Sequence, residues 1–246
     1  MDRPLKIVCL RGRTSDRTDG AGAGAEALAR LLGGRVVGEP SPGRPRGWEE
    51  DLPAARPVLE AAAAAVRESF EQGALPLLTA SDCSICIATL PAVARLVPGV
   101  RSLWVDAHGD FNGPATTPSG FLGGMCLAAA CGRWDAGWGE TIDPATVSFL
   151  GVRDLDPGER EDVAAAGVGT GVPPAGPVYV HFDVDGLDPA EMPVQFPVPG
   201  GLAAAEVREV LAGLVAQDRL VGIEVTALED PSRAGDVARI LAPVSG

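Results

Sequence analysis

Short apolar segments alternate with longer segments of helical spacing along the whole chain. The apolar segments predict strands at residues 5–10, 35–38, 75–78, 102–106, 147–151, 178–183 and 220–225. The segments between them predict helices at residues 25–32, 54–71, 85–96, 123–131, 159–166, 203–216 and 234–241. Because this alternation is typical of βαβ units, we expect a mostly parallel sheet with helices on both faces.

The segments outside these elements are rich in Gly, Pro and charged residues. Residues 11–24 and 39–56 are therefore predicted to be loops, and residues 167–176 are too short and too glycine-rich for another helix. The sequence contains no repeat and no segment with the composition of a linker. We expect residues 1–246 to form a single α/β domain, a three-layer sandwich around the sheet.

Composition narrows the class of partner. The formal net charge is −13, which argues against nucleic acid and anionic membrane surfaces, because both need clustered Lys and Arg. The N-terminus has no signal-peptide pattern and no segment is apolar enough to span a membrane, so a cytoplasmic protein is expected. The five cysteines are an odd number without framework spacing and are expected to be reduced: Cys9, Cys83, Cys86, Cys126 and Cys131.

Two acidic motifs follow predicted strands. Asp106, His108 and Asp110 come directly after one strand, and Asp183 and Asp185 come at the end of another. The carboxyl ends of parallel strands are where open sheets bind ligands. Several carboxylates at one place repel each other unless a cation neutralises them. Oxygen ligands with one imidazole favour Mn²⁺ or Mg²⁺, so the motifs predict a site for two such ions.

Each motif alone has a simpler interpretation. An aspartate after a strand is often the N-cap of a helix or a loop residue. Two such motifs at the ends of two strands make that interpretation much weaker.

The motifs WVDAHGDFN and HFDVDGLDP, together with LLTASDCS, resemble the metal-binding segments of the arginase/agmatinase (ureohydrolase) family over residues 75–231. The resemblance implies an arginase-like fold and two Mn²⁺ ions. By position, Asp106 and Asp183 would bridge the ions; Cys83 and Asp110 would complete one site, and His108 and Asp185 the other. His108 and Asp110 are the catalytic candidates, and a hydroxide held between the ions would attack a guanidino carbon.

The same resemblance suggests residues that bind an amino-acid substrate. Asn112 and Ser119 match residues that receive an α-carboxylate, while Asp154, Asp156 and Glu159 lie in a segment that resembles the α-amino-binding loop. An amino acid is therefore favoured over decarboxylated agmatine. The segment is also a good helix start, with Asp156 as N-cap, a proline next and Glu159 at the third position, and both interpretations can hold together.

Three positions depart from the family pattern. Cys83 replaces a metal-binding histidine, and a soft thiolate suits Mn²⁺ poorly, so the ion near Cys83 is expected to be weak or absent. A buried cysteine that binds no metal is an equal alternative. Gly123 replaces a proton-shuttling histidine. Ala227 replaces a glutamate that pairs with the guanidinium, for which Glu229 is the candidate substitute.

These departures favour a head group that is less basic than guanidinium. The pattern resembles the Nω-hydroxy-L-arginine hydrolases of D-cycloserine biosynthesis, an antibiotic pathway, which implies ornithine and hydroxyurea as products. Two alternatives stay open: an ordinary ureohydrolase acting on arginine, agmatine, guanidinobutyrate or formiminoglutamate, and a degenerate family member that binds a ligand without turnover. The family also makes a homo-oligomer possible.

Overall fold

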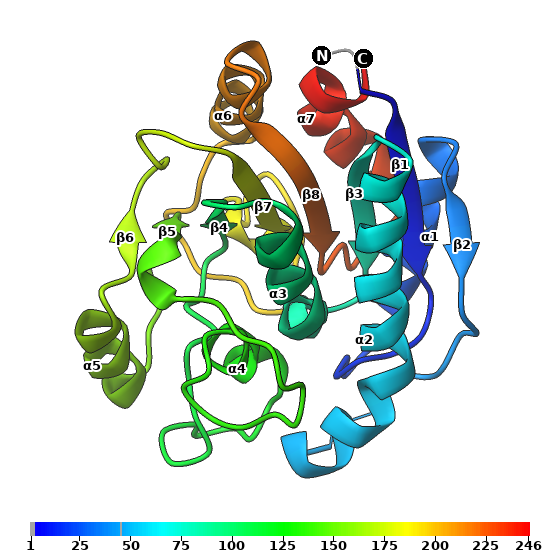
Figure 1. The fold of residues 1–246 in the computed structure, drawn as a ribbon. Coiled ribbons are helices and arrows are strands. Elements are labelled where there is room, and N and C mark those ends of the chain that lie inside the picture. Colours follow the sequence, from blue (N-terminus) through cyan, green and yellow to red (C-terminus); the bar gives the residue numbers. More distant parts are fainter. Residues whose placement is uncertain (1–2, 45) are drawn as a thin grey trace.

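An eight-stranded sheet, in which every pair of neighbouring strands is parallel, forms the centre of the molecule (Figure 1). The computed structural model describes residues 3–44 and 46–246. The strand order is β2-β1-β3-β8-β7-β4-β5-β6. The strands are β1 (Leu5–Leu10), β2 (Arg35–Val37), β3 (Leu75–Ala80), β4 (Arg101–Val105), β5 (Val147–Leu150), β6 (Gly169–Thr170), β7 (Val178–Asp183) and β8 (Leu220–Thr226).

Helices cover both faces of this sheet and make a three-layer sandwich (Figure 1). They are α1 (Gly20–Leu31), α2 (Trp48–Glu71), α3 (Cys86–Leu96), α4 (Cys126–Ala130), α5 (Pro157–Ala166), α6 (Ala204–Ala216) and α7 (Ala234–Ser245). Helices α2, α3 and α4 share one buried apolar cluster with the sheet, and α6 and α7 share another. The predicted α/β sandwich with a parallel sheet is confirmed, because β3, β7 and β8 are buried along their whole length, as a doubly covered sheet requires.

Two predicted helix starts were wrong, and one strand was not predicted. Helix α2 begins at Trp48, inside the segment predicted to be a loop, and continues through Pro53 and Pro57. Its first turn carries three acidic residues, which favour the positive end of the helix dipole, and Asp51 forms a buried ion pair with Arg13 at 2.8 Å. Tertiary contacts therefore outweigh the loss of helix propensity that the prolines cause.

Helix α1 also begins inside a segment predicted to be a loop. Its glycines meet a packing requirement: a Cβ on Gly24 would lie 1.7 Å from the carbonyl oxygen of Leu228. Only glycine lets the helix approach that backbone so closely. The third difference is β6, a two-residue strand within the glycine-rich segment, which pairs with β5.

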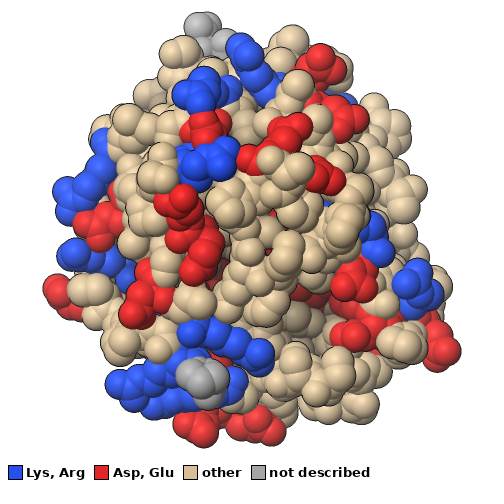
Figure 2. All heavy atoms as spheres, turned by 180° about the vertical axis from the view of Figure 1, so that it is seen from behind, with Lys and Arg blue, Asp and Glu red and all other residues tan. Residues whose placement is uncertain are grey.

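The surface carries charges of both signs. On the face seen in Figure 2, acidic and basic side chains are interspersed, with a small group of basic side chains near one edge. Over residues 3–44 and 46–246, no helix is long and apolar enough to cross a membrane. The five cysteines are all buried and unbridged, as predicted.

Candidate metal centre and substrate cavity

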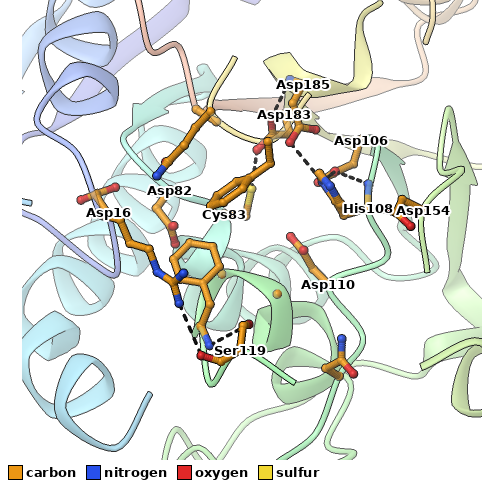
Figure 3. Close-up of a pocket in the computed structure, with 18 of the residues that line it drawn as sticks. Asp16, Asp82, Cys83, Asp106, His108, Asp110, Ser119, Asp154, Asp183 and Asp185 are labelled. Atoms are coloured by element: carbon orange, nitrogen blue, oxygen red, sulfur yellow. Dashed lines mark hydrogen bonds and ion pairs between the residues drawn. The ribbon is translucent and has the colours of Figure 1, made fainter. Parts of the chain in front are cut away.

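Four adjacent strands lead to residues that line a cavity at one edge of the sheet. Strands β3, β8, β7 and β4 are neighbours, and their carboxyl ends lead into Cys83, Ala227, Asp185 and Asp106. The sequence motifs, which lie far apart along the chain, therefore meet in one cavity (Figure 3). This follows from the parallel topology, because every strand delivers its following loop to the same side.

Asp106, His108 and Asp185 form the first group of potential metal ligands, with one donor atom from each lying within 4.8 Å of the others. The Nδ1 atom of His108 lies 3.1 Å from Asp185 Oδ2 and 3.5 Å from Asp106 Oδ1. Backbone N–H groups hold both carboxylates: Ala107 donates to Asp185 and His108 donates to Asp106. The geometry is fixed by the main chain before any ion binds.

The second group contains Cys83, Asp106, Asp183 and a residue that sequence analysis missed, His181. Cys83 Sγ donates to Asp183 Oδ2 at 2.7 Å, and the hydroxyl of Thr226 donates to the same oxygen at 3.2 Å. Asp106 belongs to both groups, which is what a carboxylate between two ions must do. We refer to the residues of these two groups together as the metal floor.

The carboxylates of the metal floor repel each other, and their pKa values show the effect. Burial and then the neighbouring Asp185 carboxylate raise the pKa of Asp183 to about 8, and the same causes raise the pKa of Asp106 well above its usual value. Burial opposes protonation of His108, but its hydrogen bonds with Asp106 and Asp185 raise the pKa to about 12. Asp106 Oδ2 is buried and has no hydrogen-bond partner among the described residues. Such a set of mutually repelling oxygens fits divalent cations.

Asp110 lies in the same cavity but in neither ligand group. Its backbone has a φ of 49°, in the left-handed region, and its carbonyl accepts the N–H groups of Leu127 and Ala128. Burial, and secondarily the charge of Asp183, raises its pKa, whereas His108 lowers it. The structure therefore brings five of the six predicted ligands into close groups and leaves Asp110 beside them.

The cavity has a volume of about 310 Å³, within the range for a small ligand. The predicted substrate-binding residues Asn112, Ser119, Asp154, Asp156 and Glu159 line it. Asn112 Nδ2 donates to Asp156 Oδ2 at 3.0 Å, which links the two predicted binding segments. The Oδ1 atom of Asn112 is buried with no partner in the described part of the chain.

Glu159 holds the cavity wall together. Its Oε1 atom accepts the N–H of Phe111 at 2.7 Å and its Oε2 atom accepts the N–H of Asp156 at 3.0 Å. Asp156 is the N-cap of α5, with Pro157 first and Glu159 third in the helix. The predicted helix start is confirmed, and the carboxylate of Glu159 is already occupied by the main chain.

Glu229 is placed away from the expected position. It does not line the cavity, and its Oε2 atom accepts the hydroxyl of Thr18 at 2.9 Å beside the start of α1. The structure gives no support to Glu229 as a substitute for the missing acidic residue at Ala227. Ala227 does line the cavity, in the left-handed conformation with a φ of 59°.

An outer wall faces the metal floor across the cavity. It consists of Asp16, Arg17, Asp82, Phe121 and Phe196, none of which the sequence analysis singled out. Figure 3 shows Asp16 and Asp82 on the side away from His108 and Asp154. Their signal in the sequence was weak, because Asp16 and Arg17 lie in a predicted loop without a recognisable motif.

Arg17 and Phe121 make the mouth of the cavity. The guanidinium of Arg17 lies 4.7 Å from the centre of the Phe121 ring and donates to the carbonyl of Ser119. Among the described residues that line the cavity, Arg17 has the only permanent positive charge. An anionic group of a ligand is therefore favoured at this end.

Asp16 and Asp82 are close acidic neighbours. Burial and the charge of Asp82 raise the pKa of Asp16 to about 7. Asp82 Oδ1 accepts the hydroxyl of Ser15 at 2.7 Å and the N–H of Ser84 at 2.9 Å. A Cβ on Gly123 would lie 3.0 Å from Asp82 Oδ2 and 2.5 Å from the Phe121 ring. The ring thus fills the space that a side chain at position 123 would need.

The parallel α/β sheet carries two groups of potential metal ligands at its carboxyl edge. The arginase family model matches residues 48–173 and 166–242. The chain is 39% identical, over 93% of its length and 90% of the relative's, to the N(omega)-hydroxy-L-arginine amidinohydrolase of Streptomyces lavendulae. It is 35% identical to the arginase of Bacillus caldovelox over 63% of this chain and 62% of that protein.

Solved structures agree. The Bacillus caldovelox arginase superposes with a TM-score of 0.82 at 26% identity, covering 99% of this chain and 97% of that one. The Entamoeba histolytica arginase has a TM-score of 0.86 at 18% identity, covering 100% and 99%, and supports the fold alone. The chain belongs to the arginase family and is a hydrolase of the ureohydrolase type.

Proposed function

We propose that the protein is a manganese-dependent amidinohydrolase that converts Nω-hydroxy-L-arginine and water into L-ornithine and hydroxyurea. The observation that carries the proposal is the lining of the cavity: the metal floor brings Asp106, Asp183 and Asp185 together, while Ala227 lines the place expected for a carboxylate that pairs with a guanidinium. The N-hydroxyguanidino group is less basic than guanidinium and has less need of that partner. The 39% identity to a hydroxyarginine amidinohydrolase supports the same substrate.

The metal floor would hold two Mn²⁺ ions, one at Asp106, His108 and Asp185 and the other at Asp106 and Asp183 next to Cys83, with Asp110 beside them. When bound, the ions supply Lewis-acid activation of water and of the guanidino group. The backbone N–H groups that hold Asp106 and Asp185 keep the carboxylates in place, so the floor does not need to rearrange for each turnover.

The amino-acid end of the substrate fits the outer part of the cavity. The guanidinium of Arg17 and the Ser119 segment line the end of the cavity where the α-carboxylate would bind. Asp154 and Asp156 offer carboxylates to the α-amino group. Charge of both signs at this end favours a zwitterionic amino acid over agmatine, which lacks the carboxylate.

Cleavage breaks the bond between the guanidino carbon and the side-chain nitrogen, which leaves as the amine of ornithine and must take up a proton. The histidine that could donate one is replaced by Gly123. Asp16, with a pKa raised to about 7 by burial and by Asp82, lines the same cavity and is about half protonated at pH 7. We assign proton donation to Asp16, directly or through one water.

A substrate panel tests the proposal. Purified, Mn²⁺-loaded protein is given Nω-hydroxy-L-arginine, L-arginine, agmatine, 4-guanidinobutyrate and N-formimino-L-glutamate, and the release of hydroxyurea, urea and formamide is measured. We expect hydroxyarginine to give a kcat/KM at least about tenfold above the others, since one lost polar match costs about 1.4 kcal/mol or more. A faster reaction with arginine or agmatine would assign the chain to the ordinary ureohydrolases instead.

Metal content and assembly give further expectations. Two Mn²⁺ ions per chain support catalysis, one supports a weakened position near Cys83, and none favours the degenerate family member that binds without turnover. We expect the enzyme to act in the cytoplasm on a small amino-acid substrate. A homo-oligomer is also expected, and light scattering would measure its mass.

A further inference from the structure

His181 lies in the ligand group of the metal floor in which Cys83 carries a thiol in place of the expected imidazole. The side chain is fully buried, and it belongs to the same group of donor atoms as Cys83, Asp106 and Asp183, all within 4.8 Å of one another. It lies two residues before Asp183 on β7, so both side chains emerge on the same face of the strand. A histidine at this position is therefore carried by the sheet and does not depend on the loop that contains Cys83.

The two nitrogens of His181 have different surroundings. Nδ1 lies 2.7 Å from Glu224 Oε1, whereas Nε2 is buried without a hydrogen-bond partner among the described residues. A carboxylate at Nδ1 stabilises the tautomer with the proton on Nδ1. The lone pair is then on Nε2, the nitrogen that is left without a partner.

Neighbouring strands hold the ring in this orientation. In the register of the sheet, His181 is paired with Glu224 on β8 and with Trp104 on β4. The Trp104 and His181 rings are stacked, with centroids 3.6 Å apart and an angle of 6° between planes. Tyr179, two residues earlier on β7, donates a hydrogen bond from its hydroxyl to Glu224 Oε2 at 2.9 Å. A carboxylate that orients the far nitrogen of an imidazole is the usual support of a metal-binding histidine.

We propose that His181 Nε2 is a ligand of the ion bound next to Cys83. The imidazole ligand of that ion then comes from β7 and not from the loop that contains Cys83. The inference rests on the proposed two-metal function and specifies its ligand set. It also accounts for the buried nitrogen, since an unpartnered polar atom inside a protein is costly unless it receives a partner. Cys83 then serves as a hydrogen-bond donor to Asp183.

The composition of the chain permits a direct spectroscopic test, because it contains only two histidines, His108 and His181. The protein is prepared without a histidine tag, and His108→Asn removes the other imidazole. Bound Mn²⁺ is then examined by electron spin-echo envelope modulation, which detects imidazole nitrogen next to the metal. We expect His108→Asn to keep one Mn²⁺ per chain with nitrogen modulation, and the double variant with His181→Asn to lose the modulation.

Equilibrium dialysis gives a second, independent measurement. We expect His181→Asn to weaken one of the two Mn²⁺ sites by about 100-fold or more, because removing a ligand costs at least as much as removing its supporting residue. Tyr179→Phe is the matched control, since it alters the same buried network but leaves the imidazole, and should keep both ions. Circular dichroism checks that each variant is folded; if His181→Asn does not fold, the His108→Asn spectrum still decides the question.

The outcomes separate the two proposals. Wild-type protein that binds two Mn²⁺ ions, together with a His108→Asn variant whose bound Mn²⁺ shows no nitrogen modulation, would overturn the role of His181 and leave the proposed function intact. Unchanged binding of two ions by His181→Asn would do the same. Wild-type protein that binds no Mn²⁺ would overturn both.

Discussion

The metal floor and the outer wall of the cavity are built in different ways. Floor residues stand within β7, at strand ends or in the segments that follow them, are largely buried, and are held by backbone N–H groups and by neighbouring strands. The outer wall comes from loops, with Arg17 packed on Phe121 and Phe196 partly exposed. The difference indicates a division of roles: the sheet fixes the chemistry, and the loops decide which molecule reaches it.

The largest effect is expected from the floor residue shared by both ligand groups. Asp106→Asn removes one charge from both positions, so we expect loss of Mn²⁺ at both and a fall in kcat/KM of at least about 100-fold. Dialysis with metal analysis and steady-state kinetics measure the two effects. Glu161→Gln removes an exposed carboxylate on α5 and is the control. Two ions retained by Asp106→Asn would show that this residue does not bridge them.

The outer wall is expected to affect turnover without affecting metal. Asp16→Asn keeps the shape but removes the proton donor, so we expect kcat to fall by about 100-fold, the lower range for general acid catalysis. The wild-type kcat should decline as pH rises through about 7, the pKa of Asp16. The kcat of the variant should not show this decline. If kcat of Asp16→Asn still declined with rising pH, or if this variant lost bound Mn²⁺, the separate roles of floor and wall would be contradicted.

Arg17 tests the wall from the substrate side. Arg17→Met keeps packing against Phe121 but removes the charge near Ser119. We expect KM for the amino-acid substrate to rise about 10- to 100-fold, the value of a charge-assisted hydrogen bond, with kcat little changed. Agmatine, which has no carboxylate, serves as the matched ligand, and its binding should not weaken. If binding of the amino-acid substrate and of agmatine weakened equally, the α-carboxylate would not bind near Arg17.

Cys83 should matter less than its place in the floor suggests. Cys83→Ala removes the thiol that donates to Asp183, and Thr226 still donates to the same oxygen. We expect Mn²⁺ affinity at that position to fall by no more than about tenfold, the lower limit for loss of an outer partner. Titration by calorimetry measures it. A loss of 100-fold or more would make Cys83 a metal ligand.

The smallest effect concerns the stability of the metal-free protein. Asp16 and Asp183 have folded-state pKa values raised to about 7 and 8, and His108 has one raised to about 12. All three bind more protons in the folded than in the unfolded state at neutral pH, so stability falls as pH rises, between about 4 and 8 for the two aspartates and between about 6.5 and 12 for His108. Mn²⁺ replaces these protons and should weaken the trend or reverse it. Thermal unfolding with and without Mn²⁺ at several pH values measures it.

Much of the floor could be predicted from sequence, because strand periodicity and DxHxD and DxD spacing are local signals. The sequence alone predicts Asp106, His108, Asp183 and Asp185 at or just after strand ends. His181 was missed because a single histidine within an apolar strand looks like a core residue, and only the register of β4, β7 and β8 shows its partners. Arg17 and Asp16 were missed because their position depends on the packing of loops.

The same distinction explains the errors in the fold. The prolines of α2 and the glycines of α1 argued locally for loops, and contacts with distant segments overruled them: Arg13 with Asp51, and Leu228 with Gly24. The number of strands was underestimated because β6 is too short to have a pattern of its own.

Phe121 restricts which residues can occupy position 123, beside it in the cavity. A side chain at position 123 would meet the Phe121 ring 2.5 Å from its Cβ, so a histidine there requires the ring to move or shrink first. Each change alone is expected to be unfavourable: Gly123→His clashes, and a smaller residue at 121 removes the stacking partner of Arg17. We therefore expect the effects of changes at positions 121 and 123 to be non-additive, so that either single change lowers stability or activity more than the two together.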